Sequence, residues 1–262
     1  MSVDDLEVAI RASIRASEII LENYGKYKQL DFKSDIDVVT EVDHKCEEAI
    51  TKILREETPE YGIMAEEGTN FPGEKVWIVD PLDGTINFSH SFPVFGPSIG
   101  LCKGDEALIG VVTDPLRDEL FYAKKGSGAF VNDLYNKGTP RKLHVSKVND
   151  LKQAIINCGL PFKRQDEYYQ KMGKKLVELH RDIQSIRYLG VAAITLAYIA
   201  AGRLEGYIVT GPHPWDMAGG VVILEEAGGK ITNFQGEPYT FDSFEWMATN
   251  GHLHDILVDR YK

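Results

Sequence analysis

Cysteine is scarce in this chain, and its placement excludes several kinds of protein. The 262 residues contain three cysteines, Cys46, Cys102 and Cys158, which lie far apart and form no Cys-x-x-Cys pair. An odd, scattered set argues against a disulfide scaffold and predicts reduced thiols in a cytoplasmic protein. The first residues lack a basic segment followed by an apolar one, so no secretory signal is expected.

Long apolar runs and an excess of basic residues are also missing. The longest apolar stretch, Leu189 to Ala201, is too short to span a bilayer and predicts a buried helix. Asp plus Glu number 40 against 29 Lys plus Arg, a formal net charge of −11. A nucleic-acid polymer or an anionic membrane requires a basic surface, so neither is an expected partner. The acidic excess suits a protein that gathers cations, although a solvated acidic surface would explain most of it.

Repeats, low-complexity segments and linkers rich in Gly, Pro or Ser are absent from the sequence. Before about residue 140, the pattern predicts helices and then an antiparallel meander, at 3–24, 43–57, 96–103, 107–114 and 119–124. After it, strands and helices alternate, at 154–158, 167–180, 183–188, 190–201, 205–209 and 218–227. We therefore predict an α/β protein with an α+β half (1–139) and an α/β half (140–262), closely packed as one globular unit.

The most informative segment is Trp77-Ile78-Val79-Asp80-Pro81-Leu82-Asp83-Gly84-Thr85-Ile86-Asn87-Phe88. Its apolar start followed by Asp-Pro predicts a buried strand that ends at the proline, which has no backbone donor for a sheet ladder. Asp80 and Asp83 can then point into one space. The carbonyl of Leu82 can turn inward between them as a third oxygen ligand for a hard cation such as Mg²⁺.

The end of this segment adds features of an anion site. Gly84 would let the backbone approach a ligand closely, and Thr85 would place a hydroxyl where a helix begins. The free N–H groups and the dipole of that helix would then face a bound anion. An Asp-Gly hairpin turn with two solvated carboxylates explains the same residues, so both interpretations stay open at this point.

Three acidic positions elsewhere have the same ambiguity. Glu66 follows a strand-like segment at 61–65, and a solvated acidic turn would explain it. Asp216 precedes a predicted helix and Asp43 opens another, so that helix capping would account for each of them.

Taken in order, these segments resemble the inositol monophosphatase family of magnesium-dependent, lithium-sensitive phosphomonoesterases. The resemblance covers nearly the whole chain and implies a homodimer with the layered αβαβα sugar-phosphatase fold. The segments that carry it are Val39-Thr40-Glu41-Val42-Asp43, Ala65-Glu66-Glu67-Gly68, Trp77 to Asn87, Gly126-Ser127-Gly128-Ala129-Phe130 and Trp215-Asp216-Met217-Ala218-Gly219-Gly220.

The resemblance also implies roles for individual residues. Glu66, Asp80 and the Leu82 carbonyl would hold one Mg²⁺, and Asp80, Asp83 and Asp216 would hold a second. A third, weaker ion is expected near Glu66, with Mn²⁺ as a possible substitute and Li⁺ as an inhibitor. Two cations of this kind would activate a water and stabilise the leaving oxygen of a phosphate ester.

Further implied roles concern the water and the substrate. Glu66 and Thr85 would orient the attacking water, and Asp43 would support a loop that brings Lys33 to the site, so Glu66, Thr85 and Asp43 form the expected catalytic set. Substrate contacts are expected at Asp83, Gly84, Thr85, Gly190, Val191, Ala192, Asp216 and Lys33.

The chain departs from inositol-specific relatives at two positions. Those relatives carry a glutamate seven positions before the Trp-Asp aspartate, where this chain has Val209, and a serine or threonine where it has Val191. Lost hydrogen bonds weaken selection for a polyol. We therefore expect a broader phosphatase, acting on inositol monophosphate and also on NADP(H), fructose 1,6-bisphosphate or a nucleotide 3′-phosphate, with residues 163–188 shaping its pocket.

An inactive metal-binding regulatory homologue is the alternative from another class. A homologue of that kind is expected to have lost part of the catalytic set. Glu66, Asp80, Asp83, Thr85 and Asp216 are all present, which favours an enzyme.

Overall fold

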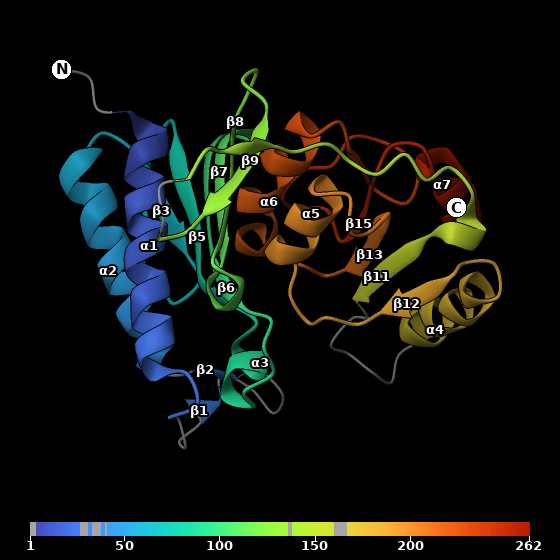
Figure 1. Cartoon of the computed structure of the whole chain (residues 1–262), viewed down its shortest axis with the longest axis horizontal. Helices are drawn as coiled ribbons and strands as arrows, with labels where there is room; N and C mark the ends of the chain where they lie inside the picture. The colour runs from blue at the N-terminus through green and yellow to red at the C-terminus, as the bar shows by residue number, and fades with distance from the viewer. Residues whose placement is uncertain (1–3, 27–30, 33–37, 40, 136–137, 160–166) are drawn as a thin grey trace.

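The computed structural model describes residues 4–26, 31–32, 38–39, 41–135, 138–159 and 167–262. Figure 1 shows five layers, in which helices and sheets alternate from the N-terminal side to the C-terminal side. This confirms the predicted αβαβα arrangement. The helices are α1 (Asp5–Asn23), α2 (Glu41–Glu57), α3 (Thr85–Ser89), α4 (Glu167–His180), α5 (Ala193–Ala200), α6 (Pro214–Glu226) and α7 (His254–Tyr261).

The larger sheet has eight strands in the order β10-β9-β8-β7-β6-β5-β3-β4. All neighbours are antiparallel except β3 and β5, and the run from β5 to β9 confirms the predicted meander. Its strands are β3 (Gly62–Ala65), β4 (Asn70–Phe71), β5 (Val76–Asp83), β6 (Gly96–Lys103), β7 (Glu106–Asp114), β8 (Glu119–Lys124), β9 (Ala129–Asp133) and β10 (Arg141–Lys142).

The smaller sheet has five strands in the order β12-β11-β13-β15-β14. The pairs of β11 with β12 and β13 are parallel, and the pairs of β15 with β13 and β14 are antiparallel. Its strands are β11 (Ile155–Gly159), β12 (Ser185–Arg187), β13 (Gly206–Thr210), β14 (Lys230–Thr232) and β15 (Glu245–Thr249). A separate antiparallel pair joins β1 (Asp31–Phe32) to β2 (Val38–Val39).

Helix α1 illustrates how the sequence forms an outer layer. Asp4 accepts a hydrogen bond from the N–H of Leu6 at the first turn, which satisfies one of the free donors there. Val8, Ala12 and Ile20 recur at helical spacing and are fully buried against α2 and the large sheet. The predicted helix over 3–24 is thereby confirmed.

Helix α6 packs unusually close to the large sheet because glycines remove side chains from the contact. A Cβ at Gly110 of β7 would lie 2.1 Å from the carbonyl oxygen of Gly219, and one at Gly100 of β6 would lie 2.7 Å from the carbonyl carbon of Ala218. Backbone therefore lies against backbone along this contact. The N-terminus of α6, with Asp216, is held beside the end of β5.

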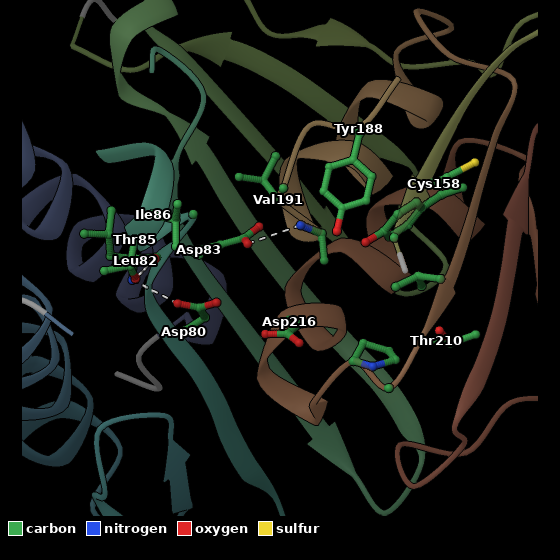
Figure 2. Close-up of a pocket in the computed structure, with 18 of the residues that line it drawn as sticks. Asp80, Leu82, Asp83, Thr85, Ile86, Cys158, Tyr188, Val191, Thr210 and Asp216 are labelled. Carbon is green, nitrogen blue, oxygen red and sulfur yellow. Dashed lines mark hydrogen bonds between the residues drawn. The ribbon is translucent and has the colours of Figure 1, made fainter. Parts of the chain in front are cut away.

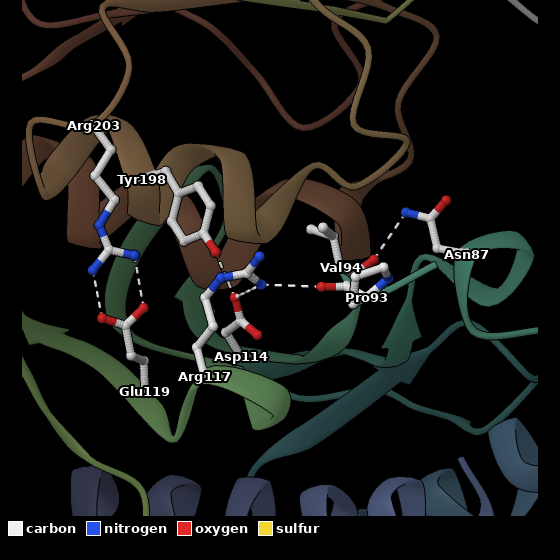
Figure 3. A network of polar contacts seen from close by, with 8 residues as sticks. All are labelled: Asn87, Pro93, Val94, Asp114, Arg117, Glu119, Tyr198 and Arg203. Atoms are coloured by element: carbon white, nitrogen blue, oxygen red, sulfur yellow. Dashed lines mark hydrogen bonds and ion pairs between the residues drawn. The ribbon is translucent and has the colours of Figure 1, made fainter. Parts of the chain in front are cut away.

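A polar network joins α5 to the connection between β7 and β8 of the large sheet (Figure 3). The hydroxyl of Tyr198 and the guanidinium of Arg117 both donate to the buried Asp114. Arg203 pairs with Glu119 and lies over the ring of Tyr198. These contacts fix the central helical layer without reaching the predicted site.

Two predicted boundaries are wrong in an instructive way. Strand β5 does not end at Pro81, because its register with β6 shifts between Asp80 and Asp83 and the proline falls in this bulge. Helix α6 begins at Pro214, since proline suits the first turn of a helix, rather than at Ala218.

Smaller differences concern α2, α5 and the loop before α2. Helix α2 begins at Glu41 rather than Asp43, and the buried helix predicted after Gly190 begins at Ala193. Between β1 and α2, where the loop with Lys33 is expected, the structure describes only β2, so Lys33 lies outside the described residues. Across the part of the chain that is described, no helix is long and apolar enough to cross a membrane.

Candidate active site

A pocket lies where the end of β5, helix α3 and the first turns of α5 and α6 meet (Figure 2). Its cavity volume is about 180 Å³. Among the expected site residues, those lining it are Glu66, Asp80, Leu82, Asp83, Gly84, Thr85, Gly190, Val191, Ala192 and Asp216. Segments distant in sequence are thus brought to one place. Asp43 lies behind this lining, and Lys33 is outside the described residues.

The turn between β5 and α3 is held by its own side chains. The carboxylate of Asp80 accepts from the N–H of Leu82 at 2.9 Å, and the carbonyl of Leu82 accepts from the hydroxyl of Thr85 at 3.2 Å. Gly84 has a φ of +93°, and a Cβ there would lie 2.5 Å from Val191. Because β5 leads into a helix here, the hairpin interpretation of this segment is wrong.

Asp83 joins this turn to the central helical layer. Its two carboxylate oxygens accept from the N–H groups of Ala192 at 3.2 Å and Ala193 at 2.8 Å, at the start of α5. Burial raises the pKa of Asp83 to about 7, while these hydrogen bonds and the helix N-terminus act to lower it. The fold therefore holds this carboxylate in place, although burial removes the water that would stabilise its charge.

Asp216 accepts a hydrogen bond at the start of α6 and also lines the pocket. It lies inside α6 as its third residue rather than before the helix, and it accepts from the N–H of the N-cap residue His213 at 2.7 Å. The same residue lines the pocket near Asp80 and Asp83 (Figure 2). Capping therefore fixes the direction in which this acidic group faces.

Asp43 has a contact that the sequence did not predict. It is fully buried in the first turn of α2, and its carboxylate accepts from the hydroxyl of Thr85 at 2.8 Å. This bond is shorter than the one from the same hydroxyl to Leu82. The Thr85 proton is therefore directed toward Asp43.

Glu47 is a second residue that sequence reasoning missed. From α2 it accepts hydrogen bonds from the N–H of Glu67 at 2.6 Å and from both the N–H and the hydroxyl of Thr69. It thereby fixes the turn that carries Glu66. A glutamate on the face of α2 that packs against the sheet was the available signal, because such a group must find donors there.

The electrostatics of the pocket favour a cation. Burial raises the pKa of Asp80 well above its usual range, and repulsion from Glu66, Asp83 and Asp216 raises it further. Among the described lining residues there is no Lys, Arg or His. Carboxylate and carbonyl oxygens are the donors that Mg²⁺ and Mn²⁺ prefer, so this donor set fits a hard divalent ion.

The carboxylates are arranged around the pocket rather than collected at one point. Within the described ranges, no three Asp, Glu, His or Cys side chains form a group that could hold an ion as they stand. Asp80, Asp83 and Asp216 each accept main-chain hydrogen bonds, and their charges repel. Binding a cation would thus require a small convergence of these side chains.

The smaller sheet forms another side of the pocket, with Val209, and the segment before α5 adds Val191 next to Gly84. These are the two positions where the sequence departs from inositol-specific relatives. Cys158 also lies on the side of the smaller sheet, and burial raises the pKa of its thiol to about 12, so that it stays protonated. All three cysteines are buried and unpaired.

Comparison with known proteins agrees with this geometry. The model of the inositol monophosphatase family matches residues 3–261. A Thermotoga maritima protein named fructose-1,6-bisphosphatase/inositol-1-monophosphatase is 33% identical, covering 98% of this chain and 95% of its own. An inositol-1-monophosphatase of Mesorhizobium japonicum is 35% identical, with coverage of 98% and 96%.

Solved structures give the same result. The extragenic suppressor protein suhB of Bartonella henselae superposes with a TM-score of 0.90 at 34% identity, covering 98% of this chain and 97% of that one. The family match spans almost all of the sequence and every segment that lines the pocket. The chain belongs to the inositol monophosphatase family.

Proposed function

We propose that this protein is a metal-dependent phosphomonoesterase that accepts several small phosphate esters. Membership of a family of phosphoric monoester hydrolases supports the reaction class. The observation that carries the proposal is the ring of four carboxylates, Glu66, Asp80, Asp83 and Asp216, around one pocket without a basic side chain among its described lining residues.

The metal ions are part of this proposal. Glu66, Asp80, the Leu82 carbonyl, Asp83 and Asp216 would hold two or three Mg²⁺ ions, with Mn²⁺ as a substitute and Li⁺ as an inhibitor. Bound ions of this kind supply an activated water and stabilise the charge on the leaving oxygen. Repulsion among the carboxylates supports the assignment, because a cation would relieve it.

Thr85 and Asp43 would position the attacking water. The Thr85 hydroxyl donates to Asp43, so its oxygen presents lone pairs to the pocket. A water that donates to this oxygen would be directed at phosphorus, with the Asp43 carboxylate behind it as the acceptor of the Thr85 proton. Glu66, on the turn held by Glu47, would contribute a second acceptor from the other side.

Main-chain groups would bind the phosphate. Gly84, Thr85 and Ile86 line the pocket at the start of α3, where the first N–H groups of a helix have no partner within the helix. Such donors point at the ligand and attract negative charge. They would hold the phosphoryl oxygens while the ester bond breaks.

The range of substrates is expected to extend beyond inositol monophosphate. The pocket presents Val209 and Val191 where inositol-specific relatives place groups for hydrogen bonds, so discrimination among leaving alcohols is weaker. The test is phosphate release with Mg²⁺ from inositol monophosphate, NADP(H), fructose 1,6-bisphosphate and a nucleotide 3′-phosphate. Activity on more than one class is expected, and strict preference for inositol monophosphate would contradict the proposal.

Assembly and regulation are separate parts of the proposal. A homodimer follows from family resemblance, and sedimentation of the purified protein should give about twice the 29.3 kDa chain mass. An inactive regulatory homologue is disfavoured because the four carboxylates and Thr85 are all present. Absence of phosphate release from every ester at saturating Mg²⁺ would favour that alternative.

A further inference from the structure

Two segments that line the pocket are far apart in sequence and meet beside Asp83. One is the turn from β5 into α3, and the other is the start of α5 with the residues before it. The carboxylate of Asp83 joins them, because it accepts from the N–H groups of Ala192 and Ala193. Under the proposed function the same carboxylate would turn toward a cation. A link made by this side chain alone would therefore weaken as the ion binds.

Asn87 makes a second link between these segments. From α3, its side-chain amide donates to the carbonyl of Leu189 at 2.7 Å and to that of Val94 at 2.8 Å (Figure 3). An amide NH₂ group has two hydrogens, so both of its donors are used. Asn87 itself does not line the pocket. One neutral side chain outside the cavity thus ties α3 to the segment before β6 and to the segment before α5.

The segments that Asn87 joins are packed with little free space between them. A Cβ at Gly84 would lie 2.5 Å from a methyl carbon of Val191 and 3.1 Å from the carbonyl oxygen of Val94. A Cβ at Gly190 would lie 3.5 Å from the side-chain oxygen of Asn87. Because interiors packed in this way transmit strain, a movement of the segment before α5 would displace Gly84, which is next to Asp83.

The segment before α5 is also held from its other side. The N–H of Leu189 donates to the buried Asn157 at 3.1 Å, and the amide of Asn157 donates to the hydroxyl of Thr195 on α5 at 2.9 Å. Thr195 donates in turn to the carbonyl of Val191 at 2.6 Å. These bonds connect the segment to the first turns of α5. The bond from Asn87 to Leu189 therefore positions the segment and the start of α5 together.

We propose that Asn87 is a positioning residue for the cation site, which keeps the start of α5 against the β5–α3 turn when Asp83 moves from its main-chain partners toward a bound ion. The inference rests on the proposed function. Without the ion, Asp83 itself joins the two segments, so the loss of Asn87 is partly compensated. With the ion, this compensation is lost. Removal of Asn87 therefore destabilises the ion-bound state more than the ion-free state and lowers the affinity for the ion.

The test measures binding of Mg²⁺ in the absence of any ester, by isothermal titration calorimetry. Asn87→Ala is expected to raise the Kd for Mg²⁺ about tenfold, the effect typical of residues that orient metal ligands. The rise in Tm that a fixed Mg²⁺ concentration produces should shrink in parallel. Asn87→Ser has a hydroxyl that can donate to one of the two carbonyls. It should raise the Kd by a smaller factor, and it provides the measurement if Asn87→Ala does not fold.

Asn250→Ala is the matched control. Asn250 is buried outside the pocket, and its amide also donates to two main-chain carbonyls of a distant segment, those of Ser146 and Val148. The variant should lower Tm equally with and without Mg²⁺ and leave the Kd unchanged. A residue with a purely structural role destabilises both states alike, so this comparison isolates the effect on the cation site.

The outcomes separate this inference from the phosphatase itself. An unchanged Kd in the Asn87 variants, or an equal rise in Asn250→Ala, would overturn the positioning role and leave the metal-dependent phosphatase intact. A wild-type protein that binds no Mg²⁺ would contradict this inference and the proposed function together. Binding of Mg²⁺ without phosphate release from any ester would contradict only the proposed function, because the comparison of Kd values still decides the role of Asn87.

Discussion

The two sides of the pocket are built on different principles. On the carboxylate side, Asp80, Asp83 and Asp216 are each oriented by main-chain N–H groups within the protein. On the side formed by the smaller sheet, which we call the outer wall, Cys158, Tyr207 and Val209 line the cavity and bring no charged group to it. The comparison indicates that main-chain contacts fix the acidic groups. Under the proposed function, the choice of alcohol would depend on the outer wall.

Removal of divalent metal ions is expected to have the largest effect, because the carboxylates could then no longer support phosphate release. Four buried or partly buried carboxylates without cations would repel one another and could not bind an anionic phosphate ester. Exhaustive chelation should abolish phosphate release, and added Mg²⁺ should restore it. Activity that survives chelation would contradict the metal-dependent mechanism.

Asp83→Asn is the sharpest single substitution on the carboxylate side. It removes a charge while keeping an oxygen that can accept from the start of α5. We expect turnover to fall by at least about 10²-fold with every ester, because a charge at the reacting centre is lost. Circular dichroism should show that the fold is retained. Asp133→Asn changes an exposed carboxylate on β9 and should leave turnover unchanged.

Asp43→Asn tests the link behind Thr85. A hydrogen bond to a carboxylate is stronger than one to an amide, so the neutral variant should lower kcat about tenfold with little change in KM. Asp114→Asn is a matched control, since Asp114 is also buried and accepts from a hydroxyl, but outside the pocket. It should lower the free energy of unfolding without changing kcat, and an equal loss of kcat in both variants would argue against a role for Asp43.

The pH dependence of stability offers a smaller effect. The pKa of Asp83 is raised to about 7 in the fold, above the value near 4 expected after unfolding. In the metal-free protein the native state then binds more protons, so this residue's contribution to stability falls as pH rises from about 4 to 7. A bound cation would stabilise the ionised Asp83 and thereby offset this loss of stability. Mg²⁺ should therefore raise Tm more at pH 8 than at pH 5.5, and this difference should shrink in Asp83→Asn.

Val209→Gln is expected to have the smallest effect, and it tests whether the outer wall influences the choice of alcohol. The substitution adds hydrogen-bonding groups to the outer wall without adding another negative charge. It should raise the kcat/KM ratio of inositol monophosphate to adenosine 2′-phosphate a few-fold, on the order of 1 kcal/mol. An unchanged ratio would show that position 209 does not discriminate between these two alcohols.

Periodicity predicted most of the helices and the meander, because it is a local signal. The αβαβα layers and most of the pocket lining were implied by the family resemblance, which short motifs carried. It misplaced the end of β5 and the start of α6, where a bulge and a first-turn proline depend on the neighbouring chain. The contact of Asp43 with Thr85 and the support of the Glu66 turn by Glu47 join residues on different elements. The buried face of α2 could indicate that Glu47 needs donors, but no local pattern could identify either partner. The division of the chain near residue 140 stays a prediction.

The glycine contact between α6 and the large sheet has a consequence for how such an enzyme can evolve. Gly110 and Gly219 let the backbones of β7 and α6 touch. The distance between Asp216 and the end of β5 therefore depends on how closely α6 approaches the sheet. A single methyl group added at Gly110 would wedge the layers apart and shift one carboxylate relative to the others. The spacing of the carboxylates therefore depends on two glycines outside the pocket lining, which limits the substitutions that these two positions can accept.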